Sequence, residues 1–180
     1  MYGAALGDMI GRPYEWHNIK TKEFPLFSRY SGFTDDTVMT AAVAEALLQI
    51  CRDYPQEEWT QEARRQTFSD IIAGAMKKWG FRYPDAGYGG RFRQWLRYGT
   101  EPYHSWGNGS AMRTSAAAWL FEDLETVRYF AALQAAVTHD HPEGIKGAEA
   151  DYGVPAALRE TCRGRLPADL REALDAVETA

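Results

Sequence analysis

The sequence has few cysteines, no long apolar run and no excess of positive charge, and each absence excludes a class of protein. Cys51 and Cys162 can form one disulfide at most, and two inert thiols in an intracellular chain are the simpler interpretation. No apolar run approaches the roughly 18 residues that a membrane helix needs. The N-terminus lacks a basic region and carries Asp8 within its apolar stretch. It is therefore a poor signal peptide, and we expect a cytoplasmic protein. The formal net charge of -5 argues against sequence-independent binding to nucleic acid.

The composition that remains is that of a folded domain. The chain has 180 residues, of which 45% are apolar, and it includes 6 Trp, 10 Tyr and 8 Phe. This length suits one domain over residues 1–180, and the aromatic content excludes a disordered chain. Alternating period-2 patterns are almost absent, whereas helical periodicity recurs. We therefore expect the all-α class, as a single compact multi-helix domain.

The clearest helical signal covers residues 35–50. Thr34 stands at the N-cap position, and Asp35 and Asp36 follow in the first turn, where the helix dipole favours anions. We expect this helix to be central and buried, with its N-terminus facing a cleft. Its apolar stripe comprises Val38, Met39, Ala42, Val43, Ala46, Leu47 and Ile50. Further helices are expected at about 57–79, 91–98, 110–121, 124–137 and 166–177.

The segment Phe33-Thr34-Asp35-Asp36-Thr37 is the most informative for function. Two adjacent carboxylates and a hydroxyl are hard oxygen ligands, which suit Mg²⁺ or Mn²⁺ rather than zinc. Taken alone, an acidic first turn that merely complements the helix dipole is the commoner explanation. The N-terminal segment GAALGDMIGRPYEWH adds Asp8, Glu15 and His17, although a run of small residues is usually a packing surface.

Two glycine-rich segments could bring backbone close to a ligand. Residues 83–90 read YPDAGYGG, and residues 107–113 read GNGSAMR ahead of an expected helix, whose free N–H groups favour phosphate. An ordinary loop is the alternative for each. His139, in His139-Asp140-His141, could touch a substrate or belong to a surface turn. The arginines and aromatics of residues 91–98 resemble a nucleic-acid platform, but a solvated helix face is favoured by the net charge. No CxxC, P-loop, GxSxG or HExxH motif supports another chemistry.

Taken together and in order, these segments resemble the ADP-ribosylglycohydrolase family, of the dinitrogenase-reductase-activating glycohydrolase type. The matching stretches are residues 3–17, 32–40, 83–90, 107–113 and 138–148, the last reading THDHPEGIKGA. The resemblance implies an all-helical fold with a binuclear Mg²⁺ or Mn²⁺ centre at the bottom of a cleft. It also implies metal-dependent hydrolysis of the glycosidic bond that joins ADP-ribose to a protein side chain or small molecule.

The resemblance assigns roles to particular residues. Thr34, Asp35 and Asp36 resemble the first set of metal ligands, and Glu15 and Asp36 are the expected catalytic carboxylates. The remaining substrate contacts implied are His17, Asp85, Gly87, Tyr88, Gly89, Gly107, Asn108, Gly109, Ser110, Met112 and His139.

One departure from the family pattern affects the metal centre. The family carries a second ligand set, Asp-x-Asp-Thr, late in its chain, and no such motif occurs here. Residues 152–171 resemble the family's C-terminus, so we expect an internal deletion near residues 150/151. It would leave an uncovered apolar surface available for self-association, and little turnover by these 180 residues. The alternatives to a hydrolase are therefore a catalytically impaired ADP-ribose-binding module and a structural descendant of the family.

Overall fold

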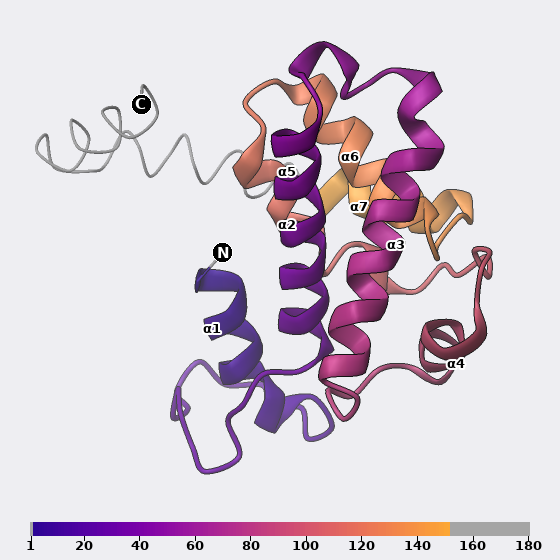
Figure 1. The fold of residues 1–180 in the computed structure, drawn as a ribbon. Coiled ribbons are helices and arrows are strands. Elements are labelled where there is room, and N and C mark those ends of the chain that lie inside the picture. The colour runs from indigo at the N-terminus through magenta and orange to yellow at the C-terminus, as the bar shows by residue number, and fades with distance from the viewer. Residues whose placement is uncertain (1, 152–180) are drawn as a thin grey trace, which may run out of the picture.

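Helices make up all the regular structure over residues 2–151, which are the residues that the computed structural model describes (Figure 1). In chain order the elements, with η for a short 3-10 helix, are α1 (Tyr2–Gly11), η1 (Arg12–Tyr14), α2 (Asp35–Asp53), η2 (Gln56–Glu58), η3 (Glu62–Arg64), α3 (Arg65–Arg82), α4 (Gly90–Tyr98), η4 (Asn108–Ser110), α5 (Ser115–Leu120), α6 (Leu124–Ala136) and α7 (Pro142–Asp151). No strand forms in this range, so the predicted all-α class is confirmed. The expected helix at 166–177, Cys162 and the 152–171 segment lie outside the described residues. Within residues 2–151, no helix is long and apolar enough to cross a membrane.

Helix α2 is the centre of the core, as its apolar stripe predicts. The side chain of Thr34 caps the helix by accepting a hydrogen bond from the amide of Asp36. Val43 and Leu47 are completely buried, and a buried leucine contributes roughly 1.5–3 kcal/mol relative to an exposed one. The helix packs along α3 and also against α5 and α1. Figure 1 shows α2 and α3 side by side, with α6 and α7 behind them.

The single helix predicted over 57–79 is wrong over residues 57–64. The structure has the short turns η2 and η3 there, and α3 begins only at Arg65. Trp59 explains the break, because its indole N–H donates to the backbone oxygen of Tyr54 at 3.1 Å while its ring packs edge-on against Phe121. A straight helix from residue 57 could not bring that indole back over the end of α2.

The helix predicted over 110–121 is also shorter than expected, since α5 covers only Ser115–Leu120. The carbonyl oxygen of Ser110 accepts side-chain hydrogen bonds from Thr114 and Gln134, both at 2.8 Å. The amide of Thr114 bonds to Ala111 instead, at 3.1 Å. Side-chain groups thus take the acceptor that an α-helix would use, and the first turn stays irregular. Helices α4 and α6 form within a residue of the expected bounds.

Hydrogen bonds fasten the loop after α3 and the turn before α5 to the first turns of α2, and the turn before α5 is also bonded to α7. The amide of Asp35 donates to the oxygen of Ala86 at 2.8 Å, which fixes the loop after α3. The hydroxyl of Thr40 lies 3.2 Å from the backbone oxygen of Met112. On the far side, Ser110 donates to the backbone oxygen of Gly144 at 2.7 Å. Segments distant in sequence therefore meet at one end of one helix.

Candidate functional site

Two hollows flank the first turn of α2, and each is lined by a different one of its two aspartates. The first, of about 330 Å³, is lined by Asp35, the glycine backbones at 89–90 and 107–109, and His139. The second, of about 530 Å³, is lined by Asp36, Glu15 and the small residues of α1. Consecutive helical side chains diverge by about 100°, which is why the two neighbours face different spaces. The predicted orientation of this helix end toward a cleft is confirmed.

Asp8 of α1 holds this helix end in place. One carboxylate oxygen accepts from the amide of Thr34 at 2.7 Å and from the amide and hydroxyl of Thr37 at 3.2 and 2.5 Å. The other accepts from the hydroxyl of Thr34 at 2.7 Å. That hydroxyl has one proton, so its 3.2 Å contact with Asp36 cannot be donated at the same time. Asp8 thereby satisfies first-turn donors that a helix leaves without partners.

The charged forms of Asp35 and Asp36 are disfavoured in this environment. Burial raises the pKa of Asp35 to about 6, and the charges of Asp36, Glu15 and Asp8 add to the effect. Burial also raises the pKa of Asp36, followed by the charge of Asp8, while the nearby Thr34 hydroxyl opposes the shift. Among the described residues, no lysine or arginine forms an ion pair with either carboxylate. A cation between them and the solvent would relieve this repulsion.

The donors for such a cation come from one short segment. Thr34, Asp35 and Asp36 supply carboxylate and hydroxyl oxygens, the chemistry that Mg²⁺ and Mn²⁺ favour. Within residues 2–151, no group of three His, Cys, Asp or Glu side chains is gathered closely enough to hold a metal ion by itself. These residues fit an ion that keeps several water ligands, as Mg²⁺ usually does.

The loop at residues 83–90 lies beside Asp35. Gly87 has a φ of 103°, which a side chain would strain, and its α-carbon faces the carboxylate of Asp35. The phenol of Tyr88 is buried with no hydrogen-bond partner among the described residues, and burial raises its pKa to about 12, helped by the charge of Asp35. Gly89 lines the first hollow. Asp85 is exposed on the loop and lines neither hollow.

The turn at residues 107–112 separates the two hollows. Gly107 and Gly109 line the first, and Asn108 and Met112 line both. Ser110 lies beneath the turn, where it is buried and bonded to Gly144. The expectation that a long helix opens here is wrong, because η4 has three residues. Any anion would meet backbone amides of the turn rather than the dipole of a full helix.

His139 lines the first hollow. It is almost completely buried, and its imidazole edge faces the glycine turn. Burial lowers its pKa to about 4, and the charge of Arg113 adds to that shift. The ring is therefore neutral at pH 7. His141, two residues on, instead packs at the surface against His104.

Two other sequence predictions fall in different places. Glu15 lines the second hollow together with Asp36. His17 lines a separate hollow with Trp16 and Tyr30 and is not gathered with the acidic pair. The structure therefore brings together most, but not all, of the predicted positions.

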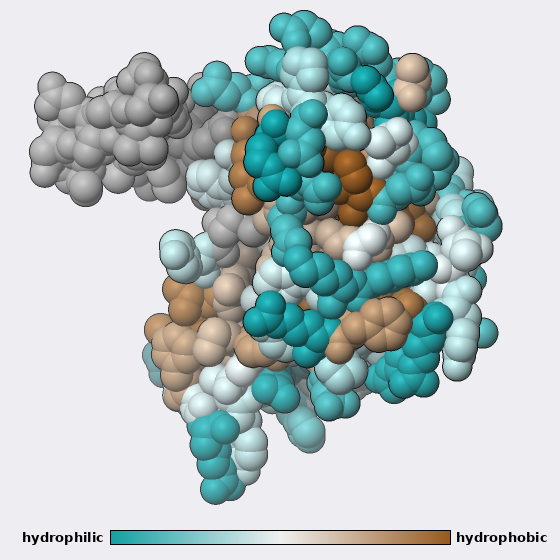
Figure 2. Space-filling model, viewed as in Figure 1, coloured by the Kyte–Doolittle hydropathy of each residue, from teal (hydrophilic) through white to brown (hydrophobic). Residues whose placement is uncertain are grey.

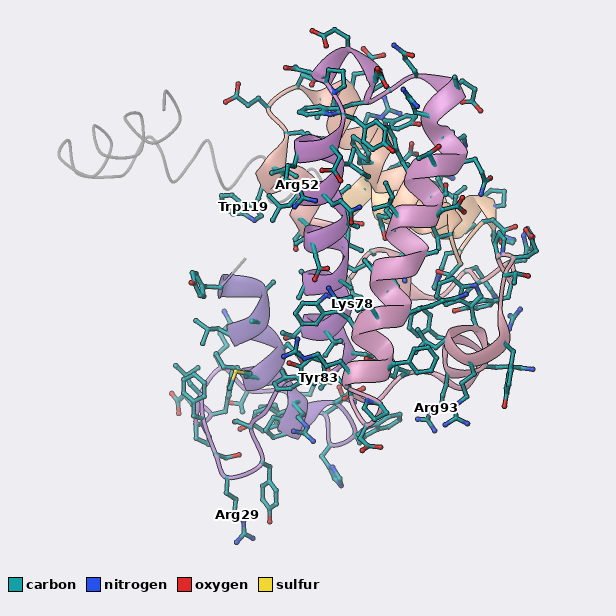
Figure 3. The ribbon with its side chains drawn as sticks, in the orientation of Figure 1. Arg29, Arg52, Lys78, Tyr83, Arg93 and Trp119 are labelled. Carbon is teal, nitrogen blue, oxygen red and sulfur yellow. The ribbon has the colours of Figure 1, made fainter. Side chains whose placement is uncertain are left out.

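The resemblance of residues 91–98 to a nucleic-acid platform, which the net charge already disfavoured, receives no support from α4. Phe92 and Trp95 are buried and stack on each other with ring centroids 5.5 Å apart, so they cannot stack on bases. Arg93 extends outward from α4, while its guanidinium also donates to the backbone oxygen of Tyr88 (Figure 3). The helix is an amphipathic one with a solvated basic face.

Two residues at the site carry no role predicted from the sequence. Asp8 clamps the acidic turn, and Arg113 lies fully buried behind His139. The signal for Asp8 is a single carboxylate within a run of small and apolar residues. For Arg113 it is a charge directly before a helix rich in alanine. Neither sequence feature by itself indicates which groups would hydrogen-bond to the charged side chain.

Comparison with known proteins places the sequence among ADP-ribosyl hydrolases. The family model for ADP-ribosylglycohydrolase matches residues 1–180. The ADP-ribosylhydrolase ARH3 of Xenopus tropicalis is 26% identical over 175 residues, covering 82% of this chain and 46% of the relative. The ADP-ribosylhydrolase ARH3 of Mus musculus is 28% identical over 178 residues, covering 81% and 44%.

The chain belongs to the ADP-ribosylglycohydrolase family. The resemblance predicted from the five motifs is thereby confirmed, as is the helical fold that it implied. The chain spans a little under half the length of the curated relatives that it matches.

Proposed function

We propose that this chain is a metal-dependent hydrolase of the glycosidic bond linking ADP-ribose to a protein side chain or a related ADP-ribosyl substrate. The observation that carries the proposal is the pair Asp35 and Asp36, which share a helix turn but face two adjoining hollows. Family membership and the names of the two relatives, both ADP-ribosylhydrolases, support the same reaction.

The metal would be Mg²⁺ or Mn²⁺, held by Thr34, Asp35 and Asp36 with water completing its coordination. The raised pKa values of the two carboxylates support this assignment, because burial first and neighbouring carboxylates second disfavour their charged forms, and a bound cation would offset both effects. When bound, such an ion polarises substrate oxygens and increases the acidity of water.

The protein groups divide the remaining tasks between the two hollows. On one side, Glu15 and Asp36 would accept and return a proton, since both line the second hollow. On the other, the glycine backbones at 89 and 107–109 would lie against the ADP-ribosyl group, with His139 as a hydrogen-bond donor. The turn itself would face the diphosphate through its amides.

Release of ADP-ribose from a modified protein tests the proposal directly. Because the sequence lacks the family's second ligand set, we expect only slow release by these 180 residues. That release should require millimolar Mg²⁺ or Mn²⁺ and stop when a chelator is added. Asp36→Asn should reduce the rate by orders of magnitude, each tenfold being about 1.4 kcal/mol of transition-state stabilisation. Asp70→Asn, an exposed change on α3, is the matched control. Release that persists with chelator or in Asp36→Asn would refute the metal-dependent mechanism.

Calorimetry with ADP-ribose, AMP and ribose separates hydrolysis from mere binding. We expect ADP-ribose to bind more tightly than either fragment. Binding of ADP-ribose without its release from modified protein would favour the alternative of an impaired ADP-ribose-binding module. If none of the three ligands binds, both the hydrolase and the binding module are refuted. We also propose a cytoplasmic location, which fractionation of cells expressing the protein would test.

A further inference from the structure

Arg113 is a buried cation whose partners are all neutral. Its Nε donates to Oε1 of Gln134 at 2.6 Å, and its Nη2 donates to the backbone oxygen of Gln134 and the hydroxyl of Thr138, both at 2.9 Å. Among the described residues, no carboxylate pairs with it. A guanidinium held this way costs desolvation, which suggests that it serves something other than stability.

The hydroxyl of Thr138 links this cation to His139. The oxygen lies 2.7 Å from Nδ1 of His139, and Thr138 is completely buried. Arginine can only donate, so the threonine oxygen must accept from it. The single hydroxyl proton of Thr138 then has one acceptor within reach among the described residues, which is Nδ1 of the imidazole.

This directionality determines which imidazole nitrogen carries the proton. If Nδ1 accepts, the proton of the neutral ring resides on Nε2. In the opposite tautomer, with the proton on Nδ1, both Arg113 and His139 would donate to the Thr138 oxygen. The buried hydroxyl proton of Thr138 would then have no acceptor, which is unfavourable. A protonated ring is disfavoured by burial and by the charges of Arg113 and Arg91, with only Asp140 opposing.

The Nε2 edge of the ring faces the ligand side. A β-carbon placed on Gly109 would lie 3.1 Å from Nε2, and one on Gly107 would lie 3.9 Å from it. Both glycines line the 330 Å³ hollow together with His139. The absence of side chains at these two positions leaves the N–H edge open to that space.

We propose that Arg113 and Thr138 are positioning residues that fix His139 as the Nε2–H tautomer, a hydrogen-bond donor for an oxygen acceptor of the ligand in the first hollow. The proposal rests on the proposed function for the identity of the ligand, an ADP-ribosyl group whose hydroxyl or phosphate oxygen would accept. The relay itself is a property of the protein without ligand.

Imidazole ¹⁵N spectroscopy of the 180-residue chain tests the relay. The resonances of His139 are assigned by comparison with His139→Asn. In the wild type we expect a non-protonated Nδ1 and a protonated Nε2 near neutral pH. Thr138→Ser retains the hydroxyl and should keep this signature, whereas Thr138→Val removes it and should shift the ring toward a mixture of tautomers. A proton on Nδ1 in the wild type, or an unchanged spectrum in folded Thr138→Val, would overturn the proposal.

Calorimetry with ADP-ribose supplies the functional readout. Loss of one well-oriented donor should weaken binding by roughly three- to tenfold in Thr138→Val, with Thr138→Ser close to the wild type. Equal affinity of the valine and serine variants would show that the tautomer does not matter for the ligand and would overturn that part. Failure of the wild type to bind ADP-ribose would refute the proposed function, while the ¹⁵N signature would still decide whether the relay exists.

Discussion

Replacing Asp8 by alanine should destabilise the domain far more than an exposed surface substitution does. The change removes one carboxylate that accepts four hydrogen bonds, two from backbone amides and two from hydroxyls. Bonds to a charged group contribute about 1.5–3 kcal/mol when deleted singly, but they are not additive, and the carboxylate is only half-buried. Relief of its repulsion with Asp36 offsets part of the loss. We expect a net loss of about 2–3 kcal/mol in the free energy of unfolding.

Asparagine at the same position separates hydrogen bonding from charge. Its amide oxygen can occupy the place of the carboxylate oxygen that accepts three bonds, and its NH₂ can donate to Thr34, whose proton then turns to Asp36 at 3.2 Å. We therefore expect Asp8→Asn to cost less than about 1 kcal/mol. Urea unfolding followed by tryptophan fluorescence measures both, with Asp70→Ala as the surface control. An Asp8→Ala variant within about 0.5 kcal/mol of the wild type would refute the clamp.

Three further predictions follow from the same geometry. Because the pKa of Asp35 is raised from 3.8 to about 6, the folded state binds more protons than the unfolded state between these values, and its stability falls as pH rises through them. Asp35→Asn should therefore stabilise the protein at pH 7 and have no such effect near pH 3, as urea unfolding at both pH values would reveal. Gly109→Ala should weaken ADP-ribose binding by roughly tenfold, since its β-carbon would lie 3.1 Å from His139, whereas Gly107→Ala, at 3.9 Å, should have a smaller effect in calorimetry. Apolar surface lies over α1 (Figure 2), and the exposed apolar side chains include Tyr2, Leu6, Leu48 and Trp119. We therefore expect self-association, and a monomer at all concentrations in light scattering would contradict this prediction.

Local pattern predicted α2 well because its signals agree with one another. The cap, the acidic first turn and the apolar stripe all indicate the same helix, which the structure extends only to Asp53. The same reasoning placed Asp35 and Asp36 at a cleft. The family resemblance predicted Gly89, Gly107 and His139 as substrate contacts. The structure places all three on one hollow, although they are up to 50 residues apart.

The errors arise where a tertiary contact decides local structure. The expected helix is interrupted at Trp59, whose indole N–H donates to the backbone oxygen of Tyr54. The backbone oxygen of Ser110 accepts from the side chain of Gln134, 24 residues away. No local sequence pattern around Trp59 or Ser110 indicates those hydrogen-bond partners. The same is true of the role of Asp8, because its four bonds run to residues that are 26 and 29 positions distant. Periodicity reports which face is buried, but not which polar groups will meet there.

Helix α1 has a consequence for the thermodynamics of ligand binding. It has no fully buried residue and packs mainly on α2 and η1, with Asp8 as its polar attachment, yet it forms a wall of the second hollow. Docking of this helix and occupation of the hollow are therefore linked equilibria. A ligand that needs the wall stabilises the docked state by RT ln(1 + [L]/Kd), which is about 2.7 kcal/mol at a hundredfold excess over Kd. Hydrogen exchange of the α1 amides should accordingly slow on saturation, so the first helix of the chain would act as a reporter of the site.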